Sequence, residues 1–155
     1  MEVSLKLRRE LELRGYRVIM TREQNDVDLS NSERASIANN NNADAFLRIH
    51  ANGSDDSETT GMMTICQTPD NPYNASLYEQ SKRLSETLLD SMVKITGANR
   101  EKDSMSGINW AAVPTTIIEM GYMSNPKEDE KLSEDSYQNE IVQGIEDGLD
   151  QYFEQ

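Results

Sequence analysis

Two side chains that can carry out chemistry follow apolar runs in this sequence. His50, the single histidine of the chain, closes an apolar run formed by Ala45, Phe46, Leu47 and Ile49, and Glu119 follows Ile117 and Ile118. A strand that ends on a polar side chain places it at the carboxyl edge of an open sheet, where α/β proteins bind ligands. An imidazole can bind a metal ion, and a carboxylate can move protons. The pattern therefore predicts a site shared by His50 and Glu119.

Each of these residues also has a structural interpretation. A single histidine after a hydrophobic run is more often a hydrogen-bonded structural residue than a ligand. A lone glutamate in a core is rarer, because an unpaired buried carboxylate is costly. The presence of both residues at equivalent points of two predicted strands favours the functional interpretation.

The composition of the chain restricts its class. The 155 residues suffice for one domain, and the formal net charge is −13. A nucleic-acid partner is not expected, since binding phosphates requires a basic face. The single cysteine, Cys66, excludes an internal disulfide and a thiolate metal cluster. No apolar stretch is long enough to span a membrane, and the charged start of the chain is not a secretion signal.

The segments that must position His50 and Glu119 alternate between strands and helices. Strands are predicted over residues 16–21, 45–50, 61–67 and 114–119. Helices are predicted up to residue 13, over residues 30–38, 74–96 and 136–153, and from the Asn125-Pro126 signal. A mixed loop is predicted over residues 99–112. This order predicts a single three-layer α/β domain, with a mostly parallel twisted sheet and helices on both faces.

Taken in order, short motifs along the whole chain carry a family resemblance. They are Gly15-Tyr16-Arg17-Val18 with Thr21-Arg22, Leu29 with Arg34 and Ala38-Asn39, Ala43-Asp44-Ala45-Phe46, Ile49-His50-Ala51-Asn52, Ser81-Lys82-Arg83-Leu84, Pro114, Ile118-Glu119-Met120-Gly121-Tyr122 and Ser124-Asn125-Pro126. Each motif alone is a weak signal, and their shared order is a strong one. The sequence resembles the zinc-dependent N-acetylmuramoyl-L-alanine amidases of the type 3 family.

The resemblance implies a peptidoglycan hydrolase that cleaves the amide between N-acetylmuramic acid and the L-alanine of the stem peptide. By that resemblance His50 is a Zn²⁺ ligand and Glu119 is the catalytic carboxylate. Zinc lowers the pKa of its bound water to about 7, and a nearby carboxylate can take the proton of that water. The expected location is extracytoplasmic, in the cell wall or secreted, although no signal is present in this chain.

The sequence departs from the family pattern in its zinc ligands. The family uses two histidines and a glutamate, and this chain has one histidine. We expect residues 1–155 to form the amidase catalytic domain without its N-terminal strand and the start of its first helix. We then expect weak zinc binding and oligomerisation through an exposed sheet edge. The alternative function is a non-catalytic peptidoglycan-binding or interaction module with the amidase fold.

Further residues are candidates for substrate contacts. Asn52 follows His50 and either binds substrate or satisfies backbone groups of the turn. Asn109 and Trp110 precede the Glu119 strand and could line a groove for a glycan. For Trp110, a place in the core is the alternative. Arg22 and Arg34 are expected to pair with the many carboxylates.

Overall fold

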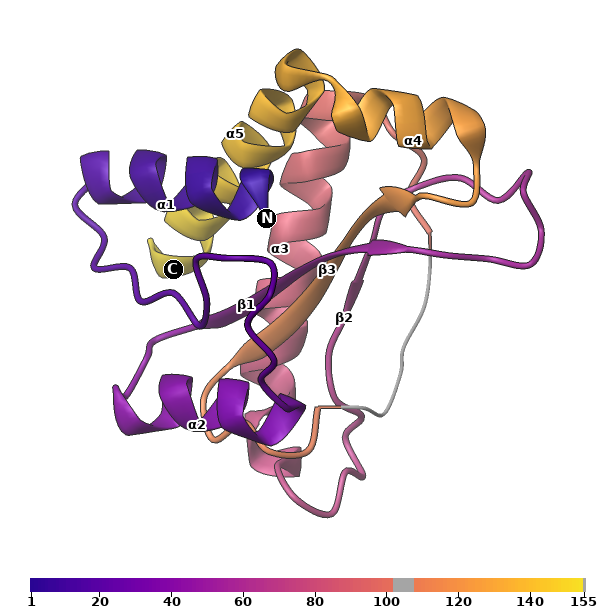
Figure 1. The fold of residues 1–155 in the computed structure, drawn as a ribbon. Helices are drawn as coiled ribbons and strands as arrows, with labels where there is room; N and C mark the ends of the chain where they lie inside the picture. Colours follow the sequence, from indigo (N-terminus) through magenta and orange to yellow (C-terminus); the bar gives the residue numbers. More distant parts are fainter. Residues whose placement is uncertain (102–107, 155) are drawn as a thin grey trace.

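A three-stranded sheet forms the centre of the computed structural model, which describes residues 1–101 and 108–154 (Figure 1). The strands are β1 (Phe46–Asn52), β2 (Met63–Ile65) and β3 (Thr115–Tyr122), in the order β1-β3-β2. β3 pairs parallel with β1 and antiparallel with β2. The sheet is therefore mixed rather than mostly parallel. The polar segment between β1 and β2 contains no crossover helix, so the chain reverses direction before β2.

Helices cover both faces of this sheet, and the predicted α/β class is confirmed. The helices are α1 (Glu2–Leu13), α2 (Asn31–Asn40), the 3₁₀ turn η1 (Ala75–Leu77), α3 (Tyr78–Thr96), α4 (Pro126–Ser133) and α5 (Asp135–Phe153). α1, α3 and α5 contribute to one large buried cluster, and α2 packs on the opposite face against Phe46. In the described part of the chain, none of the helices is long and apolar enough to cross a membrane.

Local sequence signals explain where these helices begin and end. Ser30 and Glu33 form a capping box at the start of α2, with each side chain bonded to the other residue's backbone N–H. Asn125 caps α4, and Pro126 is its first helical residue. α3 ends at Gly97, which adopts a left-handed conformation with φ of 67°.

The strand predicted over residues 16–21 is wrong. The segment is irregular, and within the described residues no backbone hydrogen bond joins positions 17–21 to a strand. A period-two burial pattern is insufficient for a strand, because a ladder also requires a partner at hydrogen-bonding distance. β1 pairs only with β3 among the described strands, so its other edge has no strand beside it. Self-association through that edge stays a prediction. The predicted loop over 99–112 lies partly outside the described residues.

Candidate active site

His50 and Glu119 occupy paired positions on neighbouring strands. In the parallel ladder of β1 and β3, the Cα of His50 is the register partner of the Cα of Glu119. Registered residues of adjacent strands lie about 4.8 Å apart and project from the same face of the sheet. On the other side of β3, Met63 of β2 is paired with Glu119. The two residues singled out from the sequence are thus immediate neighbours on one face.

The face that carries His50 and Glu119 is only partly covered. Alternation along β1 places Phe46, Arg48 and His50 on this face and directs Leu47 and Ile49 into the cluster formed by α1, α3 and α5. Phe46, at the start of β1, is covered by Ala35 and Ala38 of α2 together with residues 108–113. His50 and Glu119, nearer the carboxyl ends of their strands, are half-buried.

The environment of His50 favours the neutral form of its imidazole. Burial lowers the pKa of His50, and the positive charges of Arg48, Arg34 and Arg22 lower it further. The imidazole has no hydrogen-bond partner among the described residues. The hydrogen-bonded structural role that the sequence allowed is therefore not observed. A neutral imidazole with a free nitrogen is the form that binds metal ions.

Glu119 is a carboxyl group with an elevated proton affinity. Burial raises its pKa, and the nearby guanidinium of Arg48 opposes this shift without cancelling it. Its Oε2 atom is buried and has no hydrogen-bond partner among the described residues. A carboxylate with a raised pKa and an unfilled acceptor is suited to taking a proton from a bound molecule.

Arg48 is a site residue that the sequence reasoning missed. Its Nη2 donates to Oδ1 of Asn31 at 2.8 Å, and its Nε is buried without a partner among the described residues. Burial lowers the pKa of Arg48, and the charge of Glu119 raises it. The available signal was an arginine inside an apolar strand, two positions before His50 and therefore on the same face.

Arg22 and Arg34 do not make the ion pairs predicted for them. Nη1 of Arg22 donates to the carbonyl oxygen of Asn25 at 3.2 Å, and Nε of Arg34 donates to the carbonyl oxygen of Leu29 at 2.9 Å. Neither guanidinium has a carboxylate partner within the described parts of the chain. Both stay close enough to His50 to affect its pKa.

Asn52 holds the turn that follows β1. Its Oδ1 accepts a hydrogen bond from the backbone N–H of Gly53 at 2.8 Å, and its Nδ2 lies 3.9 Å from the sulfur of Met63. The backbone carbonyl of Asn52 accepts from the N–H of Met123 at 2.9 Å. The turn-forming alternative is thus observed, and a substrate contact stays a prediction.

Asn109 and Trp110 lie away from the pair formed by His50 and Glu119. The carbonyl oxygen of Trp110 accepts from Nδ2 of Asn39 at the end of α2, whereas Arg48 contacts Asn31 at the start of α2. Asn31 and Asn39 are eight residues apart along α2, so about 12 Å of helix separates these two contacts. Oδ1 of Asn109 accepts from Asn71 at 3.0 Å. Trp110 is 50% exposed and is not a core residue.

The described residues offer few metal donors near His50. Across residues 1–101 and 108–154, no group of three or more His, Cys, Asp and Glu side chains is arranged to hold a metal ion. Catalytic zinc sites use three protein ligands and one open position. His50 with Glu119 supplies fewer than three, so these residues alone fit zinc incompletely.

Comparisons with known proteins place this site in a family context. The chain is 27% identical over 156 residues to the N-acetylmuramoyl-L-alanine amidase LytC of Bacillus subtilis, covering 99% of this chain and 30% of that protein. It is 28% identical to the probable cell wall amidase LytH of Staphylococcus saprophyticus, covering 99% of this chain and 48% of that protein. The chain thus spans 30% and 48% of the length of these two relatives.

A solved structure shares the fold along nearly the whole chain. The catalytic domain of CwlV, an N-acetylmuramoyl-L-alanine amidase from Bacillus (Paenibacillus) polymyxa var. colistinus, superimposes with a TM-score of 0.83 at 28% identity. The match covers 99% of this chain and 82% of CwlV. The family model described as N-acetylmuramoyl-L-alanine amidase, Amidase_3, matches residues 1–151. The chain therefore belongs to the type 3 N-acetylmuramoyl-L-alanine amidase family.

Proposed function

We propose that this chain acts in peptidoglycan hydrolysis, cleaving the amide bond between N-acetylmuramic acid and the L-alanine of the stem peptide. Family membership over residues 1–151 supports the reaction class. The observation that carries the proposal is the registered pairing of His50 with Glu119 on one face of two parallel strands. This pairing puts a metal-binding group and a proton acceptor where one substrate amide can meet both.

In this proposal Glu119 is the catalytic carboxylate. Its unfilled Oε2 and raised pKa suit it to accept a proton from the attacking water. The same carboxyl group then delivers the proton to the departing nitrogen of L-alanine. The amide carbon forms a bond to the water oxygen as its bond to nitrogen breaks, which leaves a lactyl carboxylate and a free amine.

His50 is the proposed Zn²⁺ ligand. The neutral imidazole without a hydrogen-bond partner among the described residues supports this role. The described donors do not complete a three-ligand set, so the proposed metal site requires donors in addition to His50 and Glu119.

The substrate contacts and the location complete the proposal. We propose that Asn52 orients substrate beside His50 while it also holds the turn. Asn109 and Trp110, which lie near the end of α2 while Arg48 contacts its start, would contact the substrate only through a more distant part of the peptidoglycan polymer. The relatives named as cell wall amidases support an extracytoplasmic place of action, in the cell wall or secreted.

A second candidate is a peptidoglycan-binding module that does not cleave. The incomplete set of metal donors in the described residues favours it. One experiment distinguishes the two functions. Purified peptidoglycan is incubated with the protein and Zn²⁺. New amino-terminal alanine is then measured, together with the amount of protein that binds to the pelleted polymer. A cleaving enzyme releases alanine-terminated peptides, and a binding module pellets with the polymer without releasing them.

A matched pair of variants tests the role of Glu119 in that assay. Glu119→Gln should reduce the release of alanine-terminated peptides by about 100-fold or more, because a general base contributes on this order. Glu58→Gln changes an exposed glutamate of the loop after β1 and should leave the rate unchanged. Equal rates for wild type and Glu119→Gln would reject the assignment of Glu119.

A further inference from the structure

Two exposed aromatic side chains extend from loops that contact each other. Tyr73, shortly before η1, is 72% exposed, and Trp110, shortly before β3, is 50% exposed. The loops lie side by side near the start of β3 (Figure 1), because Nδ2 of Asn71 donates to Oδ1 of Asn109 at 3.0 Å. Single exposed hydrophobic residues are normal on protein surfaces, but two large rings on joined loops form a surface that a ligand can use.

The loop that carries Trp110 is held in place by amide side chains. Nδ2 of Asn74, which is 6% exposed, donates to the backbone carbonyls of Ile108 and Ala111 at 2.5 and 3.1 Å. Nδ2 of Asn39 in α2 donates to the carbonyl oxygen of Trp110 at 2.9 Å. The backbone on both sides of the indole is therefore fixed before a ligand binds, which lowers the entropic cost of binding.

Asn71 fixes the backbone that carries Tyr73. Oδ1 of Asn71 accepts a hydrogen bond from the backbone N–H of Tyr73 at 2.9 Å, while its Nδ2 bonds to Asn109. Asn71 is only 4% exposed, although both rings are in contact with solvent. One buried amide thus sets the positions of the two loops relative to each other.

An unused amide donor lies next to Trp110. Oδ1 of Asn109 accepts from Asn71, and Nδ2 of Asn109 has no hydrogen-bond partner among the described residues. Asn109 is only partly buried, so a bound molecule can reach this donor. Binding sites for small molecules combine aromatic rings with a few polar groups of this kind, which fix the orientation of the ligand.

The charge of the two loops indicates the class of ligand. Residues 67–77 and 108–112 contain no lysine or arginine, and Asp70 is their one charged residue. Phosphate-bearing polymers and peptides with free carboxylates are recognised by basic groups, which these loops lack. Aromatic rings with an amide donor match an uncharged saccharide, because its C–H faces pack on rings and its hydroxyl and N-acetyl groups form hydrogen bonds.

The loop with Trp110 lies on the face of the sheet that carries His50 and Glu119. Residues 108–113 contribute to the buried cluster that covers this face beneath α2. β3 runs about 13 Å from Glu119 back to Thr115, and Trp110 lies before that point in the chain. A polymer that extends over several sugar units can therefore contact both places, whereas the amide that is cut cannot.

We propose that Tyr73, Asn109 and Trp110 bind the glycan strand of peptidoglycan through its uncharged sugar rings. The two aromatic rings pack against sugar faces, and Nδ2 of Asn109 donates to a hydroxyl or N-acetyl oxygen. This inference rests on the proposed function, since that function makes peptidoglycan the substrate. It adds a glycan-binding surface that is separate from the pair of residues proposed to cut the amide.

The test uses glycan strands of peptidoglycan from which the stem peptides have been removed. These strands have no amide bond to L-alanine, so their binding is measured independently of hydrolysis. Trp110 is the only tryptophan of the chain, and its fluorescence therefore reports contact at this surface. The strands should change the fluorescence of the wild type saturably, and a free stem peptide at the same concentration should not.

Substitutions separate the contributions of the ring and of the amide. Tyr73→Ala should weaken binding of the strands about tenfold or more, as truncation of a ring at a binding hot spot does. Tyr73→Phe keeps the ring and should bind nearly as tightly as the wild type. Asn109→Asp keeps the oxygen that accepts from Asn71 but removes the donor, and should weaken binding about fivefold. The matched control is Leu13→Ala, at a residue of α1 that is 73% exposed, which should have no effect.

Three results would overturn the proposal. Unchanged Trp110 fluorescence in the presence of the strands would reject the glycan-binding surface, whether or not the protein releases alanine from intact peptidoglycan. Equal affinities of Tyr73→Ala and Leu13→Ala would show that the tyrosine ring takes no part. An equal response to the stem peptide would assign the surface to the peptide instead.

Failure of the proposed hydrolysis has a different signature. Strands that bind at Trp110, without release of alanine from intact peptidoglycan, would reject the hydrolysis and support the glycan-binding surface. Thermal melts of each variant confirm that the fold is retained.

Discussion

Gly144 of α5 lies directly against the backbone of Met92 in α3. A Cβ atom added to Gly144 would lie 2.6 Å from the Cα of Met92, a distance that real Cβ contacts do not reach. Gly148, one turn further along α5, is also close to the backbone of α3, since its added Cβ would lie 3.0 Å from the Cα of Leu88. The two helices beneath the sheet therefore pack with their backbones in near contact, and glycine is the residue that permits it.

The substitution Gly144→Ala should destabilise the protein. Alanine favours a helix over glycine by about 1 kcal/mol, but the added methyl group must separate α5 from α3, and overpacking costs about 1–3 kcal/mol or more. We expect a net loss of about 1–2 kcal/mol in the free energy of unfolding, measured by urea denaturation. The control is Gly53→Ala, where an added Cβ meets no atom within 4 Å. Equal stability of both variants would contradict the close packing.

The substitution Glu119→Gln should stabilise the protein at neutral pH. Because burial raises the pKa of Glu119 above its ordinary value of 4.5, the folded state binds this proton more tightly than the unfolded state. The charged carboxylate thus lowers stability at pH values above 4.5, and this cost disappears as pH falls below 4.5. The Tm of Glu119→Gln should exceed that of wild type near pH 7 and match it near pH 4. A variant less stable than wild type at both pH values would show that the carboxylate is structurally required.

The control for this experiment is Glu58→Gln. Glu58 is exposed in the loop after β1, and its side chain has no partner among the described residues. Its substitution should leave the Tm the same as wild type at both pH values. If the Tm of Glu58→Gln rose as much as that of Glu119→Gln, the increase would reflect a general effect of lowering the net negative charge.

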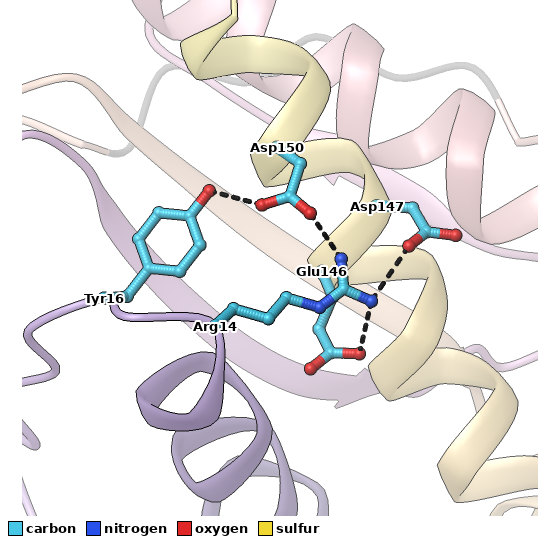
Figure 2. A network of polar contacts seen from close by, with 5 residues as sticks. All are labelled: Arg14, Tyr16, Glu146, Asp147 and Asp150. Atoms are coloured by element: carbon cyan, nitrogen blue, oxygen red, sulfur yellow. Dashed lines mark hydrogen bonds and ion pairs between the residues drawn. The ribbon is translucent and has the colours of Figure 1, made fainter.

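The contact between Arg14 and Glu146, shown in Figure 2, should contribute measurable stability. The Glu146 side chain is 7% exposed, so Arg14→Met would leave a buried carboxylate without its guanidinium at a cost of about 1–3 kcal/mol. Replacing both residues by methionine should recover part of this loss, with a coupling energy of about 1 kcal/mol in a double-mutant cycle. Arg9→Met is the control, since the Arg9 side chain is 80% exposed and its substitution should change stability by less than about 0.5 kcal/mol. If the effects of the Arg14 and Glu146 substitutions on the free energy of unfolding were additive, Arg14 would act mainly through Asp147 and Asp150.

Zinc binding by this chain should be weak and should depend on His50. One imidazole and one carboxylate lack the cooperative ligand set that gives structural zinc sites about 10–16 kcal/mol, so we expect a Kd weaker than about 1 μM by calorimetry. His50→Ala should abolish the remaining binding, and EDTA should leave the Tm of the wild type unchanged. Nanomolar binding that survives His50→Ala would place the metal elsewhere in the protein.

The helices were the part of the fold most accessible from the sequence. Capping signals at Ser30, Asn125 and Gly97 act through neighbouring backbone groups, so the residues that determine these helix ends are adjacent in the chain. Strands depend on distant partners instead. Residues 16–21 have the composition of a strand and form none, because no described strand pairs with them.

The candidate site was predicted in part. His50 and Glu119 were recognisable because each ends an apolar run, and their family motifs identified the reaction class. Arg48 was missed because its position two residues before His50 becomes informative only when the strand and its exposed face are known. Arg22 and Arg34 were expected to pair with carboxylates, and their guanidinium groups instead bond to backbone carbonyls and line a groove with Arg48.

The sequence by itself determined the alternation of helices and strands, the family and the two side chains with catalytic chemistry, since these follow from local pattern and motif order. Only the tertiary structure decided that His50 and Glu119 are register partners, that β2 runs antiparallel to β3, and that five arginines line one groove beside β1. Those features depend on which strands pair and on which faces meet. They are set by contacts between residues far apart in the chain, which no local pattern encodes.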